Sequence, residues 1–196
     1  MAIGSEFKSS GITANTPKTI WLNAGTIHKG LTCTDGVWNA EESLICATSG
    51  GSKLSIVPEF YDVPVDGALV KVKGLTVKVG ETATLEINPI ELKPEILKMA
   101  LVGDEKQSDT ATGYMEMTSR AVMNEGDYIE NLGYVGKTVD GKPIIVLFDY
   151  AVCTSGLELE GKNKEAAVPK FTFECIADLT PEADTLPWHI YYPAEA

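Results

Sequence analysis

The stretch KLSIVPEFYDVPVDGALVKVKGLTVKVGETATLEINPIEL, from Lys53 to Leu92, contains the pattern that decides the fold. Near its end, apolar and polar residues alternate. The apolar positions are Ala83, Leu85 and Ile87, and the polar positions are Thr82, Thr84 and Glu86. Successive side chains of a strand point to opposite faces of its sheet, so this period of two predicts a strand with one buried and one polar face.

The beginning of the same stretch predicts a strand at the edge of a sheet. Pro58 and Pro64 have no amide hydrogen to donate to a neighbouring strand, and proline is therefore confined to edges and bulges. Val65-Asp66-Gly67 predicts a turn. We expect a second strand after this turn, where valines alternate with lysines at Val70, Lys71, Val72 and Lys73.

Three carboxylates lie along this edge, at Glu59, Asp62 and Asp66. They suggest either an acid/base cluster for catalysis or the acidic edge of a strand pair. No nucleophile, metal ligand or basic partner stands beside them in a recognisable motif. The sequence therefore favours the strand edge.

The rest of the chain predicts a mainly β fold. Short apolar runs are separated by glycine, proline or Asp-Gly, which is typical of an antiparallel β-sandwich or barrel. A strand pair is expected around Ala24-Gly25, and Asp140-Gly141 predicts a hairpin. The predicted helix runs from Pro94 to about Val102, with Gly103 as a left-handed cap. In KFTFECIAD, residues 170–178, the apolar Phe171, Phe173 and Cys175 alternate with polar residues and predict a further strand. We therefore expect about eight strands and one flanking α-helix.

The length of 196 residues favours a single domain. We assign residues 19–196 to this domain and residues 1–18 to an N-terminal extension. Met1–Phe7, MAIGSEF, has neither the basic nor the apolar part of a secretory signal, and GSEF is compatible with translated cloning sites. Residues 32–52 are expected to form a long loop or arm, and residues 102–113 a shorter polar loop, because long loops in compact domains are often functional.

The charge of the chain argues against nucleic-acid binding. There are 16 Lys and Arg against 28 Asp and Glu, a formal net charge of −12, and Arg120 is the single arginine. A surface that grips nucleic acid needs a basic stripe to neutralise phosphates. We therefore expect the protein to repel DNA rather than hold it. No apolar run approaches the about 20 residues of a membrane span, so no membrane contact is expected.

No motif predicts an enzyme or a cofactor. Gly133–Thr138, GYVGKT, is similar to the end of a phosphate-binding loop, but Asn131 stands where that motif needs a glycine. A G-x-S-x-G nucleophile motif does not occur, and neither His28 nor His189 has the spacing of a metal or nucleophile site around it. The cysteines show no C-x-x-C spacing and are expected to be free thiols: Cys33, Cys46, Cys153 and Cys175.

Taken in order, several segments resemble one known family. They are ATSGGSKLSIVPEFYDVPVDGALVKVKGL (47–75), PEILKMAL (94–101), the Asp140-Gly141 hairpin, GLELEGKNKEAAVPKFTFEC (156–175) and TLPWHIYYP (185–193). From about Thr19 to Pro193, this order resembles the major tail tube protein of long-tailed, non-contractile bacteriophages and prophages of Gram-positive hosts. None of these segments is a catalytic motif, so the resemblance depends on their order.

The resemblance implies a structural protein of the virion. In that family a small β-sandwich or barrel with one flanking helix assembles into hexameric rings, and the rings stack into a tube whose lumen conducts DNA into the host. The implied partners are further copies of the chain, the tape-measure protein, and the tail terminator and baseplate proteins, with DNA passing without specific binding. The protein would be made in the cytoplasm of the bacterial host and would end in the virion tail, without a cofactor.

Two sets of residues are candidates for these roles. Those expected to line the lumen are Lys71, Lys73, Thr82, Thr84, Glu86 and Asn88. Alternation indicates a polar face but not what it faces, so an ordinary solvent-facing strand side stays open for them. Those expected in an arm that reaches a neighbouring ring are Thr32, Trp38, Glu41, Glu42, Ile45, Gly50 and Gly51.

Other functions also stay open. A β-sandwich binding or adhesion module would have a similar composition, although a spaced aromatic platform and a signal peptide are missing. The inner tube of a contractile injection system would share the architecture. An enzyme of unrecognised type is disfavoured because no catalytic motif occurs.

Overall fold

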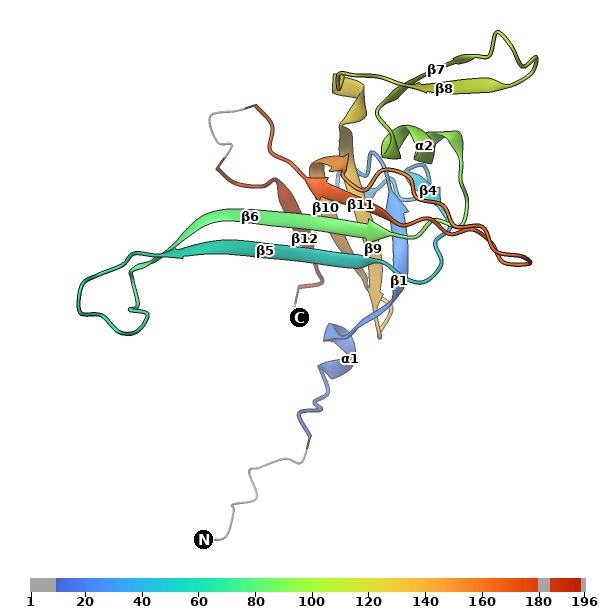
Figure 1. Cartoon of the computed structure of the whole chain (residues 1–196). Helices are drawn as coiled ribbons and strands as arrows, with labels where there is room; N and C mark the ends of the chain where they lie inside the picture. The colour runs from blue at the N-terminus through green and yellow to red at the C-terminus, as the bar shows by residue number, and fades with distance from the viewer. Residues whose placement is uncertain (1–9, 180–183, 195–196) are drawn as a thin grey trace.

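The computed structural model describes residues 10–179 and 184–194, except for the side chains of residues 22–24. Its main sheet has eight strands and is antiparallel throughout (Figure 1). Along the hydrogen-bonded path the order is β4 (Leu44–Cys46), β1 (Trp21–His28), β9 (Ile129–Thr138), β10 (Pro143–Cys153), β11 (Phe171–Cys175), β6 (Thr76–Ile87) and β5 (Lys53–Asp62). The eighth strand, β12 (Trp188–Tyr191), pairs with β10 beside this path.

Smaller elements surround the main sheet. Two hairpins form two-stranded sheets of their own: β2 (Cys33–Thr34) with β3 (Val37–Trp38), and β7 (Gly103–Gln107) with β8 (Met115–Ser119). The described helices are α1 (Thr16–Thr19), α2 (Pro94–Ala100) and a 3-10 turn, η1 (Glu125–Asp127). Of these, the sequence predicted only α2.

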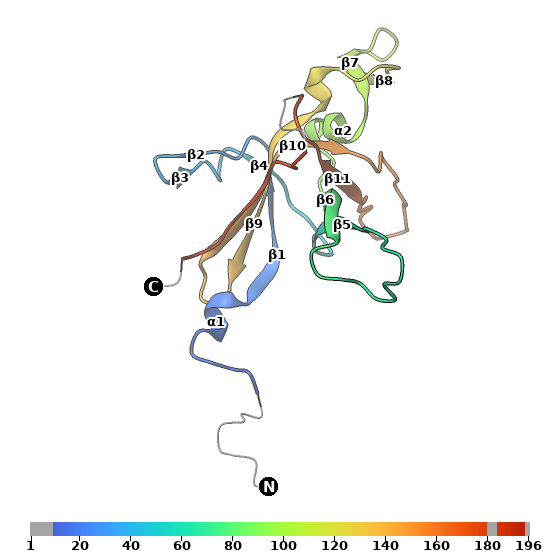
Figure 2. The same ribbon diagram turned by 90° about the vertical axis from the view of Figure 1, so that its left-hand side faces the viewer.

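Strand β10 belongs to both halves of the main sheet. Residues 145–148 pair with β12, residues 151–153 pair with β11, and β9 runs along the opposite edge. The sheet therefore divides between these two segments, and β1 and β9 face β5, β6 and β11 (Figure 2). This confirms the predicted mainly β fold, an antiparallel β-sandwich with a flanking helix, and the described strands do not close into a barrel.

The core fills the space between the two halves. β6 and β11 direct alternate residues inward, as their sequences predicted, and α2 adds side chains from one end. The buried residues of these three elements are Ala83, Leu85, Ile87, Phe171, Phe173, Cys175, Ile96, Met99 and Ala100. A second cluster, Leu31, Ile145 and Leu147, lies on the outer face of β10, where Trp38 of the β2–β3 hairpin covers it.

One predicted turn and one predicted loop are wrong. The Ala24-Gly25 turn is not present, since residues 21–28 form one strand with an irregularity between Leu22 and Thr26. Gly25 adopts a φ of +64°, and a Cβ atom there would lie 2.4 Å from the ring of Tyr134, so glycine is required at this bulge. The polar loop at residues 102–113 is instead largely β7 and its turn; α2 ends at Ala100, and Gly103 begins β7 rather than capping the helix.

Residues 32–52 do not form a free arm in this structure. The β2–β3 hairpin packs the ring of Trp38 against Tyr191 at 5.1 Å, and β4 pairs with β1, so that Ile45 is only 6% exposed. Beyond β4, the amide side chain of Asn88 donates to the carbonyl oxygen of Gly51 at 3.0 Å. This segment is therefore part of the body. Of the expected extension, residues 1–18, the first nine residues lie outside the described residues.

Replacing Ile45 with alanine tests whether β4 is part of the core. We expect Ile45→Ala to lower the free energy of unfolding by about 2–5 kcal/mol, because it leaves a cavity among buried side chains. The matched control is Leu44→Ala in the same strand, where the side chain is 50% exposed, and there we expect a loss of about 1 kcal/mol or less. Urea denaturation of both variants measures the difference, and equal losses would contradict the assignment of Ile45 to the core.

Candidate functional site

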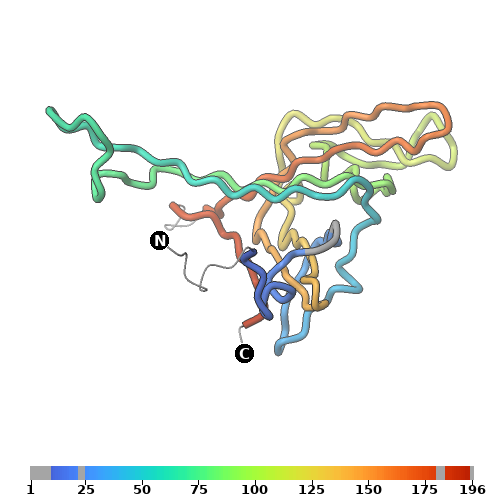
Figure 3. The backbone as a smooth tube through the Cα atoms, turned by 90° about the horizontal axis from the view of Figure 1, so that it is seen from below, coloured from blue at the N-terminus to red at the C-terminus, as the bar shows by residue number. Residues whose placement is uncertain are grey.

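The hairpin of β5 and β6 extends well beyond the body and is the most prominent feature of the molecule (Figures 1 and 3). Its inner part lies on the core, where Leu54 and Ile56 pack against buried residues. From Pro58 outward, β5 pairs only with β6, and residues 57–61 are exposed. We call residues 58–81 the arm.

The arm ends in an apolar tip, residues 63–75. Leu69 is 98% exposed and Val70 is 77% exposed, and three further valines of the tip, Val63, Val65 and Val72, are also exposed. Exposed apolar side chains gathered in this way are typical of a contact surface in a soluble protein. Among the described residues, the body of the same chain makes little contact with these side chains.

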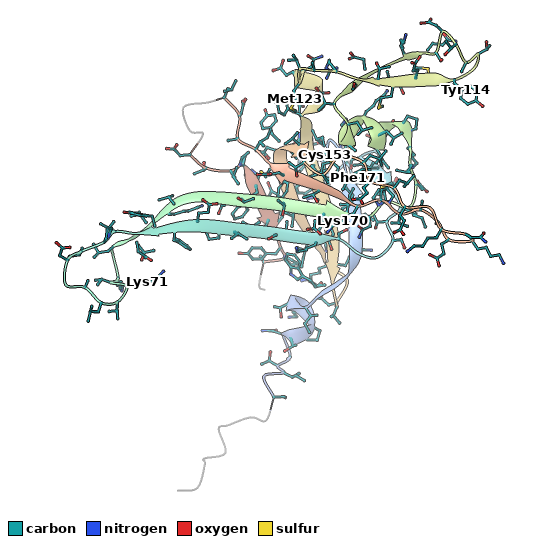
Figure 4. The ribbon with its side chains drawn as sticks, viewed as in Figure 1. Lys71, Tyr114, Met123, Cys153, Lys170 and Phe171 are labelled. Carbon is teal, nitrogen blue, oxygen red and sulfur yellow. The ribbon has the colours of Figure 1, made fainter. Side chains whose placement is uncertain are left out.

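The tip is a loop, although the alternation of valine and lysine predicted a strand. No neighbouring strand continues past Asp62, and β6 begins only at Thr76. The sequence predicted Lys71 and Lys73 beside Thr82 on a polar sheet face, but both lie in the tip loop. Figure 4 shows Lys71 at the end of the arm.

Hydrogen bonds hold the tip in place at its base. The ammonium group of Lys71 lies 2.6 Å from one carboxylate oxygen of Asp62, and the hydroxyl of Thr76 donates to the other at 2.6 Å. The Val63 amide donates to the Leu75 carbonyl at 2.9 Å. The hydrogen bonds from Lys71 and then from Thr76 lower the pKa of Asp62. The tip is thus presented as a shaped loop and not as a loose end.

The three carboxylates of this stretch do not form an acid/base cluster. Asp62 is engaged in the base of the tip, Asp66 lies in the tip itself, and Glu59 faces the other side of β5 from Asp62. Glu59 and Asp62 belong to the edge of a strand pair, as the sequence favoured, and Asp66 lies in the loop that joins its two strands.

A β-bulge and a hydrogen bond fix the direction in which the arm leaves the body. Glu59 is opposite Gly80 and Phe60 is opposite Lys78, so Val79 is an extra residue in β6. Beside this bulge, the Nε1–H of Trp188 donates to the Glu81 carboxylate at 2.9 Å, and Lys78 pairs with its other oxygen at 2.8 Å. Lys78 and then Trp188 lower the pKa of Glu81.

Removing the indole donor should loosen the root of the arm. Trp188→Phe keeps most of the half-buried ring and deletes the hydrogen bond to Glu81. We expect the backbone amides of residues 76–82 to exchange with deuterium faster, because this end of β6 loses its contact with β12. Trp38→Phe, whose ring packs on Tyr191 instead, is the control. Unchanged exchange in Trp188→Phe would contradict a role at the arm root.

The polar residues of β6 lie on the outer face of the main sheet. Thr82, Thr84 and Glu86 alternate with the core residues, as predicted. Neighbouring strands extend this face, because Ser55 and Glu174 lie on either side of Thr84, and Thr172 lies beside Glu86. Sequence reasoning identified the alternation of both β6 and β11 but not their pairing. Asn88 follows the strand and is half-buried. What this face lies against stays a prediction.

Glu86 holds two lysines on this outer face. Its carboxylate lies 2.6 Å from Lys170 and 3.4 Å from Lys53, and its side chain is 21% exposed. Figure 4 shows Lys170 on the body, near the end of the sheet away from the arm tip. Lys170 is the main cause of the lowered pKa of Glu86, with Lys53 contributing less. The face thus presents its cations already paired.

This ion pairing predicts a dependence of stability on pH. The folded-state pKa of Glu86 lies below its unfolded value of about 4.3. The pairs therefore stabilise the fold above that value, and the stabilisation disappears as the pH falls through the folded-state pKa. We expect Glu86→Gln to unfold more easily than the wild type at about pH 7, with a smaller difference at about pH 3.

Glu174→Gln is the matched control, since Glu174 shares this face and forms no ion pair among the described residues. Urea denaturation at both pH values measures the effect. If the free energy of unfolding of Glu86→Gln differs from that of the wild type by the same amount at both pH values, the role of the ion pairs is contradicted.

The residues expected in an arm at 32–52 are spread over the body. Thr32, Glu41, Glu42 and Gly50 are exposed, Trp38 and Gly51 are half-buried, and Ile45 is buried. The segment that projects is instead residues 58–81, which the sequence predicted only as paired strands. A role of the 32–52 residues in assembly stays a prediction.

Outside the arm and the outer face, His28 is held by hydrogen bonds within the fold. His28 is buried, with Nε2 at 2.8 Å from the Thr26 hydroxyl and Nδ1 at 3.0 Å from the Ser43 hydroxyl, and burial lowers its pKa. The four cysteines are free thiols. Within residues 10–179 and 184–194, no three His, Cys, Asp or Glu residues are grouped as a metal site would need. In the same ranges, the helices are too short to cross a membrane.

Comparison with known proteins finds distant similarity among solved structures. Neither a protein-family model nor a curated protein sequence matches the chain. A solved structure described as "Virion of native gene transfer agent (GTA) particle" contains a chain that aligns with a TM-score of 0.40 and 13% identity. The alignment covers 87% of this chain and 96% of that chain. This similarity is too low to assign a function.

Proposed function

We propose that the protein is the structural subunit of a phage tail tube, in which hexameric rings of the chain stack around a lumen that conducts DNA. The observation that supports this proposal most directly is the arm. It extends an apolar tip, with Leu69 almost fully exposed, away from the core of its own chain. A subunit that assembles buries such a surface against a neighbour, whereas in a free monomer the same surface would promote aggregation.

The open edge of the main sheet also supports assembly. β5 has β6 as its single partner among the described residues, so its outer edge is free to bond to another chain. Unpaired strand edges are a hazard in a monomer, and closing strands of several subunits into a ring removes them. Pro58 lies in this edge and limits pairing in other registers, because it has no amide hydrogen to donate.

The outer face of β6 and β11 suits a conduit for DNA. Thr82, Thr84 and Thr172 are neutral, and Glu86 occupies the two lysines of the face. A phosphate group would therefore find few free cations on this face, in a chain with a net charge of −12. We propose that this face lines the lumen, without Lys71 and Lys73, which lie in the tip.

The sequence resemblance supports the finer parts of the proposal. The tube would belong to a non-contractile tail of a phage or prophage of Gram-positive hosts, with the tape-measure protein inside it and the terminator and baseplate proteins at its ends. The chain would act without catalysis or cofactor, after synthesis in the host cytoplasm. An inner tube of a contractile injection system and a β-sandwich binding module are the alternatives that the experiment must separate.

Electron microscopy of the concentrated purified protein tests the proposal. We expect rings or tubes with a central hole for the wild type, and no tubes in Leu69→Asp, because a charge in the tip cannot be buried against a neighbour without cost. Leu179→Asp is the matched control, since Leu179 is also fully exposed but lies outside the arm; it should assemble normally.

The outcomes separate the alternatives. Monomers at every concentration and salt would contradict the tube and favour a binding module. Tubes with Thr82 and Thr84 on the outer wall would keep the tube and contradict the assigned lumen face. Because the tip lies away from the core, Leu69→Asp should unfold at the same urea concentration as the wild type, which excludes misfolding as the cause of its defect.

A further inference from the structure

A groove of about 690 Å³ opens on the body between β1, β4 and β9. Its lining is mostly apolar or without a side chain, and includes Leu44, Cys46, Ala47, Val135, Gly25 and Gly136. β4 has only three residues and ends the path of the main sheet, so nothing in the described chain closes the groove on that side. Leu44 at its rim is 50% exposed.

The tip of the same chain cannot fill this groove. The arm leaves the body on one side, and β1, β4 and β9 lie on the other side, in both the first view and the view from below (Figures 1 and 3). The root of the arm is held by Trp188 and by the register of β5 and β6, so the arm does not fold back over the body without breaking these contacts. Only a second chain can bring a tip to the groove.

The charges beside the tip and beside the groove are complementary. In the tip, Asp66 and Lys73 form no ion pair with the described residues. The groove is lined by one exposed acid and one exposed base, Glu41 and Lys137, which are likewise unpaired among the described residues. Each surface thus combines apolar residues with one acid and one base that are unpaired among the described residues, a composition that allows two surfaces to match.

We propose that the groove receives the arm tip of a second copy of this chain, with Leu69 and Val70 buried in it. Lys73 then faces Glu41 of the groove, and Asp66 faces Lys137. This inference rests on the proposed function and names the surface that the arm contacts. The contact joins two different surfaces, so it leaves one tip and one groove free and repeats from copy to copy, either closing into a ring or continuing as an open series.

Two variants that each damage one surface test the contact. Leu69→Asp damages the tip, and Ala47→Trp fills the groove from an exposed position. Each variant alone should assemble no further than its basic unit, which is a single subunit or a single ring, because further assembly needs both surfaces. A mixture of the two should form pairs of that unit and stop there, since the intact tip of Ala47→Trp fits the intact groove of Leu69→Asp. Sedimentation velocity measures these sizes.

Ala47→Ser is the control for the groove and should assemble as the wild type does, because it leaves the groove open. Exchanging the charges gives a second test. Lys73→Glu and Glu41→Lys should each raise the concentration needed for assembly roughly two- to five-fold, as expected for an exposed ion pair. The double variant should return to the wild-type value, a rescue that a purely structural role of either residue would not produce.

The outcomes distinguish this contact from the tube itself. Normal assembly of Ala47→Trp, together with failure of Leu69→Asp, would overturn the groove as the receptor and leave the tail tube standing. Pairs in the mixture, with wild-type assemblies that have no central hole, would support the contact and overturn the tube. Absence of pairs in the mixture, when the wild type assembles, would also overturn the contact.

Discussion

The structure depends on one strand, β10, which hydrogen-bonds to three others. β9 runs along one edge, and β12 and β11 share the other edge in succession. Phe148 is buried beside the point where the sheet divides, and residues 144–148 are all buried. Because β10 is covered on both faces, it can hold two half-sheets at an angle and leave their inner faces to make a single core. The arm, the groove and the outer polar face all take their positions from this division.

The arm follows from a mismatch of lengths. β6 has twelve residues, but β11 pairs only with its last four, Thr84–Ile87. The remainder of β6 has β5 as its sheet neighbour, and together the two strands leave the body. A two-stranded ribbon is marginally stable alone. The Glu81–Trp188 hydrogen bond supports the arm at its root, and the salt bridge at Asp62 supports it at the base of the tip. A projecting surface of defined shape is the result.

The sequence predicted those elements in which the pattern of apolar residues indicates a buried face. β6 and β11 alternate strictly because each has one face in the core, and Pro94 marks the start of α2 because its missing amide hydrogen has no role there. β7 was missed because its sequence, GDEKQ, has no apolar face; pairing with β8 and ion pairs such as Lys98–Glu105 hold it instead. The alternation at 70–73 predicted a strand that has no partner, since alternation measures exposure of side chains and not pairing. Neither the groove nor the projection of the arm could be predicted, because each depends on strands far apart in the chain.

The direction of the arm has a mechanical consequence. The strands of the arm continue without a break into the body, and β6 enters the core beside β11. A pull applied at the tip therefore acts along the strands, and the hydrogen bonds between β6 and β11 resist it together, not one after another. A ladder loaded in this shearing geometry is stronger than one opened from its end. Traction between neighbouring copies would thus pass through Thr84–Ile87 into β11 and β10, the parts of the fold with the most buried side chains.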